Sequence, residues 1–247
     1  MATRACLAVG CVVLLPVALL AASFSINPVR IDLAAERPYA VVQVTNTADL
    51  PVTLQARAYS WTGDEAHGGL TPTDGIILNP PLLNIAPKAT RFIRLGLRNP
   101  NRGTVELTYR LILQEVPKTL DASDGAAVHT ILRISVPVFA APKSPVKGSL
   151  EWKLEETAPG KFTLTAANKG NAHLQVLELS ITPAGKTLAP MALAAPVYVL
   201  PGQSRQWDVD APDFAGQSAL KAVAKTNAGT SEYIIETANP GMAKGSQ

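Results

Sequence analysis

The sequence predicts an all-β protein made of two antiparallel β-sandwich domains. Three observations lead to this prediction. Apolar and polar residues alternate over short segments, which is the period of a half-buried strand. Clusters of Asn, Asp, Pro and Gly separate these segments, and few windows carry an amphipathic helical period of useful length. A polar stretch with two prolines, residues 141–145, divides the strands into two sets.

The N-terminal segment, residues 1–23, is predicted to be a signal peptide. Arg4 supplies a positive start, Cys6 to Leu20 is almost wholly apolar, and Ala21-Ala22-Ser23 offers the small residues that signal peptidase requires. We expect cleavage after Ser23; an uncleaved anchor and a lipoprotein at Cys11 are the alternatives. Both cysteines lie in this segment, so the exported chain has no disulfide. Because no other segment is apolar enough to span a bilayer, we expect no membrane insertion after signal cleavage.

The first domain is expected over residues 24–142. Alternation or apolar enrichment predicts strands over residues 39–44, 52–61, 90–97, 105–116 and 128–139. Turn-forming residues separate these strands at 46–49, 62–64, 79–81 and 99–101. Short strands at this spacing favour an antiparallel sandwich over βαβ units.

The second domain is expected over residues 147–238. Its predicted strands are residues 150–155, 161–168, 174–181, 197–200, 205–209, 220–227 and 233–237. Pro142 and Pro145 cannot continue a sheet ladder, so we interpret residues 141–145 as a semi-rigid linker.

Composition and motifs argue against catalysis and against nucleic-acid binding. The formal charge is +3, and removal of residues 1–23 takes away Arg4 and no acidic residue, which leaves about +2. The sequence has no nucleophile elbow, phosphate-binding glycine loop or zinc-ligand spacing. His67, His129 and His173 are far apart in the sequence, and we interpret them as surface residues. We therefore predict no enzymatic activity, no cofactor, no metal and no nucleic-acid partner.

The last predicted strand of the first domain, residues 128–139, carries most of the functional information. Its even positions form an almost uniformly apolar face: Val128, Thr130, Leu132, Ile134, Val136 and Val138. Pro137 has no N–H to donate, which places the strand at or near a sheet edge. An apolar edge strand is an aggregation hazard unless it is covered or used. For residues 134–138 we favour packing in the domain's own core, and for residues 128–132, beside a polar loop, exposure as a template.

Short segments along the whole mature chain resemble the periplasmic pilus-assembly chaperones of the chaperone–usher pathway. In the first domain they are Ser25–Arg30, Val44–Asn46, Asn79–Pro81, Ile85–Pro87, Arg91–Leu95, Tyr109–Pro117 and Ile134–Phe139. In the second domain they are Asn168–Asn171 and Tyr198–Gly202. Each is weak alone, but their order across two sandwich domains after a signal peptide is specific. The Tyr109-Arg110-Leu111 run resembles a divergent branch that includes spore-coat-like and sigma-type fimbriae.

The resemblance implies two immunoglobulin-like domains set as a boomerang, a periplasmic location, and two partners: pilin-like subunits and an outer-membrane usher. In this family the subunit is an incomplete sandwich, and the chaperone completes it with the last strand of its first domain. The implied donor residues are Val128, Thr130 and Leu132, with Ile134 and Val136 nearer to the cleft between the domains. Neither ATP nor another cofactor is implied.

The resemblance also implies basic residues in the cleft that hold the carboxyl-terminal carboxylate of the subunit. Arg30 matches one such position. A lysine on the last strand of the better-known branch aligns here with Pro137, and an asparagine of that branch aligns with Ile112, so this sequence departs from the pattern. We therefore expect a carboxylate clamp of Arg110 with Arg30, and Arg133 as a third candidate, because an arginine fork suits a carboxylate.

Two other classes of function compete with the chaperone interpretation. A structural or adhesive component of a surface fibre would lack a strand or carry a free N-terminal extension, whereas here the first strand begins close to the predicted cleavage site. A carbohydrate-binding or hydrolytic sandwich would need exposed aromatic platforms or paired carboxylates, and aromatic residues make up only 5% of the chain. Both comparisons favour the chaperone.

Overall fold

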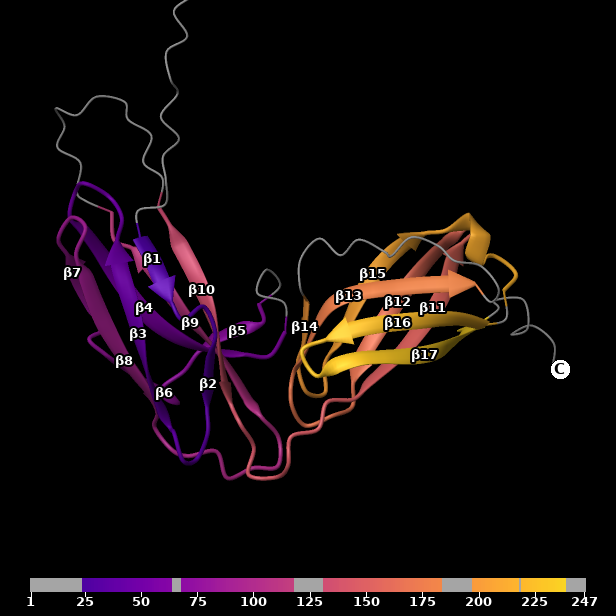
Figure 1. The fold of residues 1–247 in the computed structure, drawn as a ribbon, viewed down its shortest axis with the longest axis horizontal. Helices are drawn as coiled ribbons and strands as arrows, with labels where there is room; N and C mark the ends of the chain where they lie inside the picture. Colours follow the sequence, from indigo (N-terminus) through magenta and orange to yellow (C-terminus); the bar gives the residue numbers. More distant parts are fainter. Residues whose placement is uncertain (1–23, 64–67, 118–130, 184–196, 218, 239–247) are drawn as a thin grey trace, which may run out of the picture.

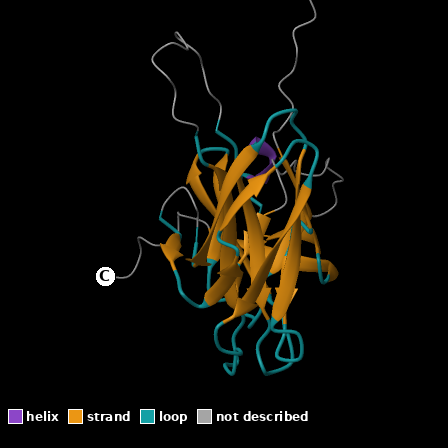
Figure 2. Cartoon of the chain, turned by 90° about the vertical axis from the view of Figure 1, so that its left-hand side faces the viewer, coloured by secondary structure: helices purple, strands orange, loops and turns teal. Residues whose placement is uncertain are grey.

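The computed structural model describes residues 24–63, 68–117, 131–183, 197–217 and 219–238. They form two β domains set at an angle, with the connecting segment at the vertex (Figure 1). Strands dominate the described part of both domains, and the short 3₁₀ helix Pro212–Phe214 is the purple segment in Figure 2. The predicted all-β class and two-domain arrangement are confirmed. The predicted signal peptide lies outside the described residues, and no helix within the described ranges is long and apolar enough to cross a membrane.

The first domain is a sandwich of two sheets. The four-stranded sheet has the order β1 (Phe24–Asn27), β3 (Tyr39–Asn46), β8 (Thr90–Leu97) and β6 (Ile76–Asn79). The six-stranded sheet has the order β2 (Ile31–Leu33), β10 (Arg133–Ala140), β9 (Leu107–Glu115), β4 (Val52–Trp61) and β5 (Leu70–Pro72), and β7 (Leu82–Ile85) pairs with the first half of β4. The chain therefore moves from one sheet to the other between β1 and β2.

Alternate residues of both sheets form one apolar core. Its largest fully buried side chains include Leu54, Ile85, Ile93, Leu95, Leu111 and Leu113. Burial of each side chain of this size contributes roughly 1.5–3 kcal/mol. Tyr109 also lies in this core, and burial raises the pKa of its hydroxyl above the usual value of 10.0. The residues between the core positions face outwards, which gives the six-stranded sheet a second, outer face.

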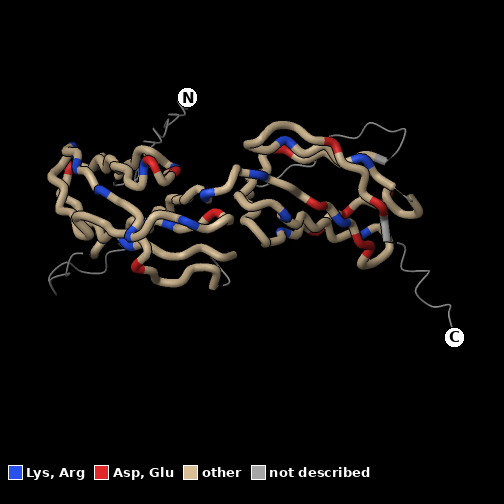
Figure 3. The backbone as a smooth tube through the Cα atoms, turned by 90° about the horizontal axis from the view of Figure 1, so that it is seen from below, with Lys and Arg blue, Asp and Glu red and all other residues tan. Residues whose placement is uncertain are grey.

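The second domain is built from one continuous ladder of seven strands. Their order is β14 (Val197–Val199), β13 (Leu174–Pro183), β16 (Ala219–Thr226), β17 (Gly229–Ala238), β11 (Leu150–Ala158), β12 (Lys161–Asn168) and β15 (Ser204–Asp210). A short parallel pairing of β17 with β11 joins the two halves of the ladder, and both halves contribute side chains to one core. Basic and acidic residues are distributed over both domains (Figure 3).

Three buried asparagines, Asn46, Asn101 and Asn168, fix the turns in which they lie. In each, Oδ1 accepts a hydrogen bond from the N–H two residues later, which closes a local turn. Each Nδ2 then donates to carbonyls of separate segments, including those of Ile85, Ala140 and Val199. Burying an amide without such partners is costly, so these hydrogen bonds stabilise the conformation of each turn.

The segment between the domains is held by the turn that contains Gly170 and Asn171. The Nδ2 of Asn171 donates to the carbonyls of Thr104 and Pro145 and to the Ser144 hydroxyl, and its Oδ1 accepts from the Lys147 N–H at 2.7 Å. A Cβ at Gly170 would collide with the Lys147 carbonyl oxygen, so only glycine fits there. These bonds tie the linker to both domains and fix the angle between them.

Candidate functional site

An aromatic cluster joins the two domains at the floor of the cleft. Trp61 at the end of β4, Phe139 of β10 and Leu200 are buried in it, and Tyr198 of β14 packs against them. The ring centroids of Trp61 and Phe139 are 6.1 Å apart, and those of Trp61 and Tyr198 are 5.6 Å apart. Because both domains contribute rings, a side chain that packs on the cluster is held in a fixed position relative to both domains.

Arg110 lies on this cluster. It stands on β9, opposite Tyr59 of β4 on one side and Pro137 of β10 on the other. Its guanidinium carbon is 3.6 Å from the Trp61 ring centroid and 5.9 Å from that of Tyr198. Stacking on a ring uses the face of a guanidinium, whereas hydrogen bonding to a carboxylate uses its edge. Stacking on Trp61 is therefore compatible with carboxylate binding.

Arg30 lies beside the same cluster, with its guanidinium carbon 5.2 Å from the Phe139 ring centroid. Within the chain it already holds a carboxylate: its Nε donates to both oxygens of Asp32 at 3.1 Å, and an Nη donates at 2.9 Å. The two side chains are 34% and 53% exposed, so this ion pair contributes little to stability. The structure therefore brings Arg30 and Arg110 onto neighbouring rings.

Arg133 does not join these two arginines. It is exposed at the start of β10, opposite Gln114, whereas Arg110 lies opposite Pro137. At about 3.4 Å per residue, the two positions are about 14 Å apart along the sheet, too far to share one carboxylate. Of the three arginines predicted to form a clamp, the structure brings Arg30 and Arg110 together and places Arg133 apart from them.

The strand β10 lies at an edge for much of its length. β2 pairs with it only from Val138 to Ala140, and no described strand pairs with that edge of β10 before Val138. The Glu115 N–H donates to the Leu132 carbonyl, so the even residues of β10 bond to β9 and the odd residues direct their main chain outwards. Pro137 is an odd residue, and its missing N–H therefore costs no bond to β9.

The predicted donor residues differ in their surroundings. Val128 and Thr130 lie outside the described residues. Leu132 and Ile134 are partly buried at the rim of the first-domain core and keep some surface. Val136 is only 1% exposed inside that core, so it has no surface to offer a partner in this structure, which corrects its assignment as a donor. Residues on one apolar face thus divide between the domain's own core and its rim.

His173 was interpreted from the sequence as a surface residue, and that interpretation is wrong. It is 6% exposed, and its ring stacks on Phe139 with centroids 3.5 Å apart. The Oε2 of Glu106 accepts a hydrogen bond from the His173 N–H at 2.8 Å and lies 2.7 Å from its Nδ1. This contact links the segment before β9 to the second domain. The other histidines, His67 and His129, lie outside the described residues.

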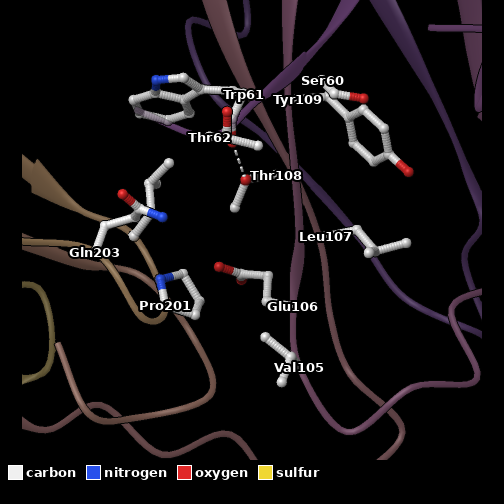
Figure 4. Close-up of a pocket in the computed structure, with 11 residues that line it drawn as sticks. Ser60, Trp61, Thr62, Val105, Glu106, Leu107, Thr108, Tyr109, Pro201 and Gln203 are labelled. Carbon is white, nitrogen blue, oxygen red and sulfur yellow. Dashed lines mark hydrogen bonds between the residues drawn. The ribbon is translucent and has the colours of Figure 1, made fainter. Parts of the chain in front are cut away.

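A pocket of about 290 Å³ lies between the domains beside this contact. It is lined by the end of β4, the start of β9 and the loop that contains Leu200 and Gln203. Figure 4 shows the Glu106 side chain extending towards Pro201, across the gap between the domains. Among the side chains that the structure describes, no group of three or more His, Cys, Asp or Glu is arranged to hold a metal ion.

The first domain matches the family model described as pili and flagellar-assembly chaperone, PapD N-terminal domain, over residues 23–145. This chain belongs to that family. The match includes Arg30, Arg110 and the whole of β10, and the family is one of assembly chaperones rather than enzymes. The finer assignment to a sigma-type or spore-coat-like branch stays a prediction.

Solved structures share the two-domain fold. A chain of the CsuC–CsuE chaperone–tip adhesion subunit pre-assembly complex, from archaic chaperone-usher Csu pili of Acinetobacter baumannii, superposes with a TM-score of 0.65 at 22% identity, covering 88% of this chain and 100% of that chain. A chain of the Salmonella enterica SafA pilin–SafB chaperone complex gives 0.58 at 16% identity, with coverages of 86% and 96%. The Pseudomonas aeruginosa CupB2 chaperone gives 0.52 at 15% identity, with coverages of 85% and 98%. No curated protein matches the chain by sequence. At these identities the likeness establishes the fold.

Proposed function

We propose that this protein is a periplasmic chaperone that binds pilin-like subunits by donating a strand and delivers them to an outer-membrane usher. The observation that carries the proposal is the edge of β10 before Val138, which combines outward main-chain groups with an apolar rim. Membership of an assembly-chaperone family supports it, as does the predicted signal peptide.

Strand donation uses the outer main chain of β10. A subunit strand pairs with the odd residues of β10 that precede Pro137. This ladder ends at Pro137, which has no N–H to donate, and from Val138 onwards β2 occupies the edge. Leu132 and Ile134 add apolar contacts at the rim, and full burial of each contributes roughly 1.5–3 kcal/mol. Val128 and Thr130 stay predicted donors.

The carboxylate of the subunit's C-terminus is held by Arg110. Since Arg110 lies opposite Pro137, a subunit strand that runs along β10 towards the cleft ends close to this guanidinium. Arg30, on the neighbouring ring, assists by exchanging Asp32 for the subunit carboxylate. A charge-assisted, forked hydrogen bond gives both strength and a fixed register.

The test is periplasmic co-expression with a candidate pilin-like subunit, followed by purification of the complex. The wild-type chaperone is expected to give a one-to-one complex that resists mild denaturant. Leu132→Glu is expected to abolish it, because a charge at the rim opposes burial under the subunit. Ile234→Glu is the matched control, since Ile234 is 72% exposed on β17 of the second domain.

Circular dichroism of each free variant separates loss of binding from loss of folding. If Leu132→Glu unfolds the free protein, Leu132→Ser is the milder replacement. Complex at wild-type yield with a folded Leu132 variant would contradict strand donation at this edge.

A further inference from the structure

The outer face of the six-stranded sheet looks towards the cleft and is basic. We define this cleft face by the outward residues of three strands: Gln55, Arg57, Tyr59 and Trp61 of β4; Thr108, Arg110, Ile112 and Gln114 of β9; and Arg133, Ser135, Pro137 and Phe139 of β10. Their neighbours along each strand, such as Ala56, Leu111 and Val136, lie in the core, which establishes the alternation. These three strands contribute three arginines and no acidic residue to the face, and on the adjacent β2 Asp32, opposite Phe139, is paired with Arg30.

Arg57 is the arginine of this face that the sequence did not single out. It is exposed and lies opposite Ile112, one diagonal step from Arg110. Diagonal neighbours on adjacent strands have Cβ atoms about 7–8 Å apart, so Arg57 and Arg110 are neighbours on the same side of the sheet. Neither Arg57 nor Arg133 makes an ion pair with another described residue.

We propose that Arg57 and Arg133 bind acidic side chains of the captured subunit, on a surface that continues from the carboxylate anchor Arg110. This inference rests on the proposed function. The exposed positive charges of Arg57 and Arg133 attract an acidic surface from a distance and orient it during association. The planar guanidinium then binds each carboxylate at short range through paired hydrogen bonds.

The positions of the two arginines specify how the subunit lies. Arg133 is on β10 itself, whereas Arg57 is two strands away, about 10 Å across the sheet. A subunit that only extended the sheet from the edge of β10 would contact Arg133 alone. Contact with Arg57 requires the body of the subunit to cover β9 and β4, so the subunit lies over the cleft face.

The test measures the association rate of a subunit that co-purifies with the wild-type chaperone. The subunit is diluted from denaturant into purified chaperone at low and at high salt. Arg57→Glu and Arg133→Glu are each expected to slow association about tenfold at low salt and less at high salt, because salt screens steering. Arg57→Lys is expected to keep most of the rate.

Arg94→Glu is the matched control, because Arg94 is an exposed arginine on β8 of the opposite sheet and undergoes the same charge change. Arg57→Glu that associates like Arg94→Glu would overturn the inference while leaving strand donation intact. An effect of Arg133→Glu alone would overturn the placement of the subunit over β4. Failure of the wild-type protein to capture any subunit would instead refute the proposed function itself.

Discussion

The two domains differ in their basic residues. Residues 24–142 contain nine arginines and two lysines, whereas residues 147–238 contain one arginine and seven lysines. In the second domain, lysines pair with acids of neighbouring strands, as in Lys225–Glu178 at 2.7 Å and Lys221–Glu232 at 2.9 Å. In the first domain, Arg110 stacks on an aromatic ring of the cleft and Arg57 faces the same side. Other cations of the first domain are paired with acids as well, as in Lys88–Asp49 at 2.9 Å, so the difference lies in the arginines that its six-stranded sheet directs towards the cleft.

The largest effect is expected where the first-domain cations meet the cleft. Arg110→Ala removes the guanidinium from the carboxylate site, and loss of one partner of such a pair costs about 2–5 kcal/mol. The affinity for the subunit is therefore expected to fall by about thirtyfold or more, since about 1.4 kcal/mol corresponds to a factor of ten. The affinity of Arg110→Lys is expected to lie between those of the wild-type protein and Arg110→Ala, because lysine keeps the positive charge and loses the forked pair of hydrogen bonds.

Titration of the subunit against each purified variant measures this loss. Lys225→Ala, in the second domain, is the control, and its affinity is expected to equal that of the wild-type protein. If Arg110→Ala binds the subunit as tightly as Lys225→Ala does, Arg110 does not hold the subunit carboxylate.

A smaller effect is expected where the domains meet. Glu106→Ala leaves the buried His173 N–H and Nδ1 without their partner, which is expected to lower the free energy of unfolding by roughly 1–3 kcal/mol. The angle between the domains is also expected to vary more, which small-angle X-ray scattering detects. Glu106→Gln keeps an acceptor and is expected to do less damage.

The second domain again supplies the comparison. Glu178→Ala removes an exposed pair with Lys225, and exposed pairs contribute about 0.2–1 kcal/mol. Equal destabilisation by Glu106→Ala and Glu178→Ala, measured by chemical denaturation, would show that the buried contact does not hold the domains together.

The longer strands could be predicted from the sequence because their alternation extends over eight or more residues. The predicted segments 52–61, 90–97 and 161–168 coincide with β4, β8 and β12. The short strands β2, β5, β6 and β7 have three or four residues each, which is too few for a period to emerge. Their place is decided by pairing partners that are distant in the sequence.

The candidate site could be predicted only in part. The family resemblance pointed to Arg30 and Arg110, and the structure places them together, but the register of β9 and β10 separates Arg133 from them. The alternation of residues predicted the apolar face of β10. It did not separate Val136, which is buried in the core, from Leu132, which lies at the rim of the core. The contact between Glu106 and His173 joins segments from different domains, and no local pattern reveals it.

The central claim, that β10 gives its outer edge to a subunit strand, is tested most directly by amide hydrogen exchange. The Arg133 N–H points outwards, whereas the Ile134 N–H already bonds to β9. Residue-resolved exchange in the free protein and in the subunit complex is expected to show strong slowing at Arg133 and little change at Ile134. An Arg133 amide that exchanges equally fast in an intact complex would contradict the claim.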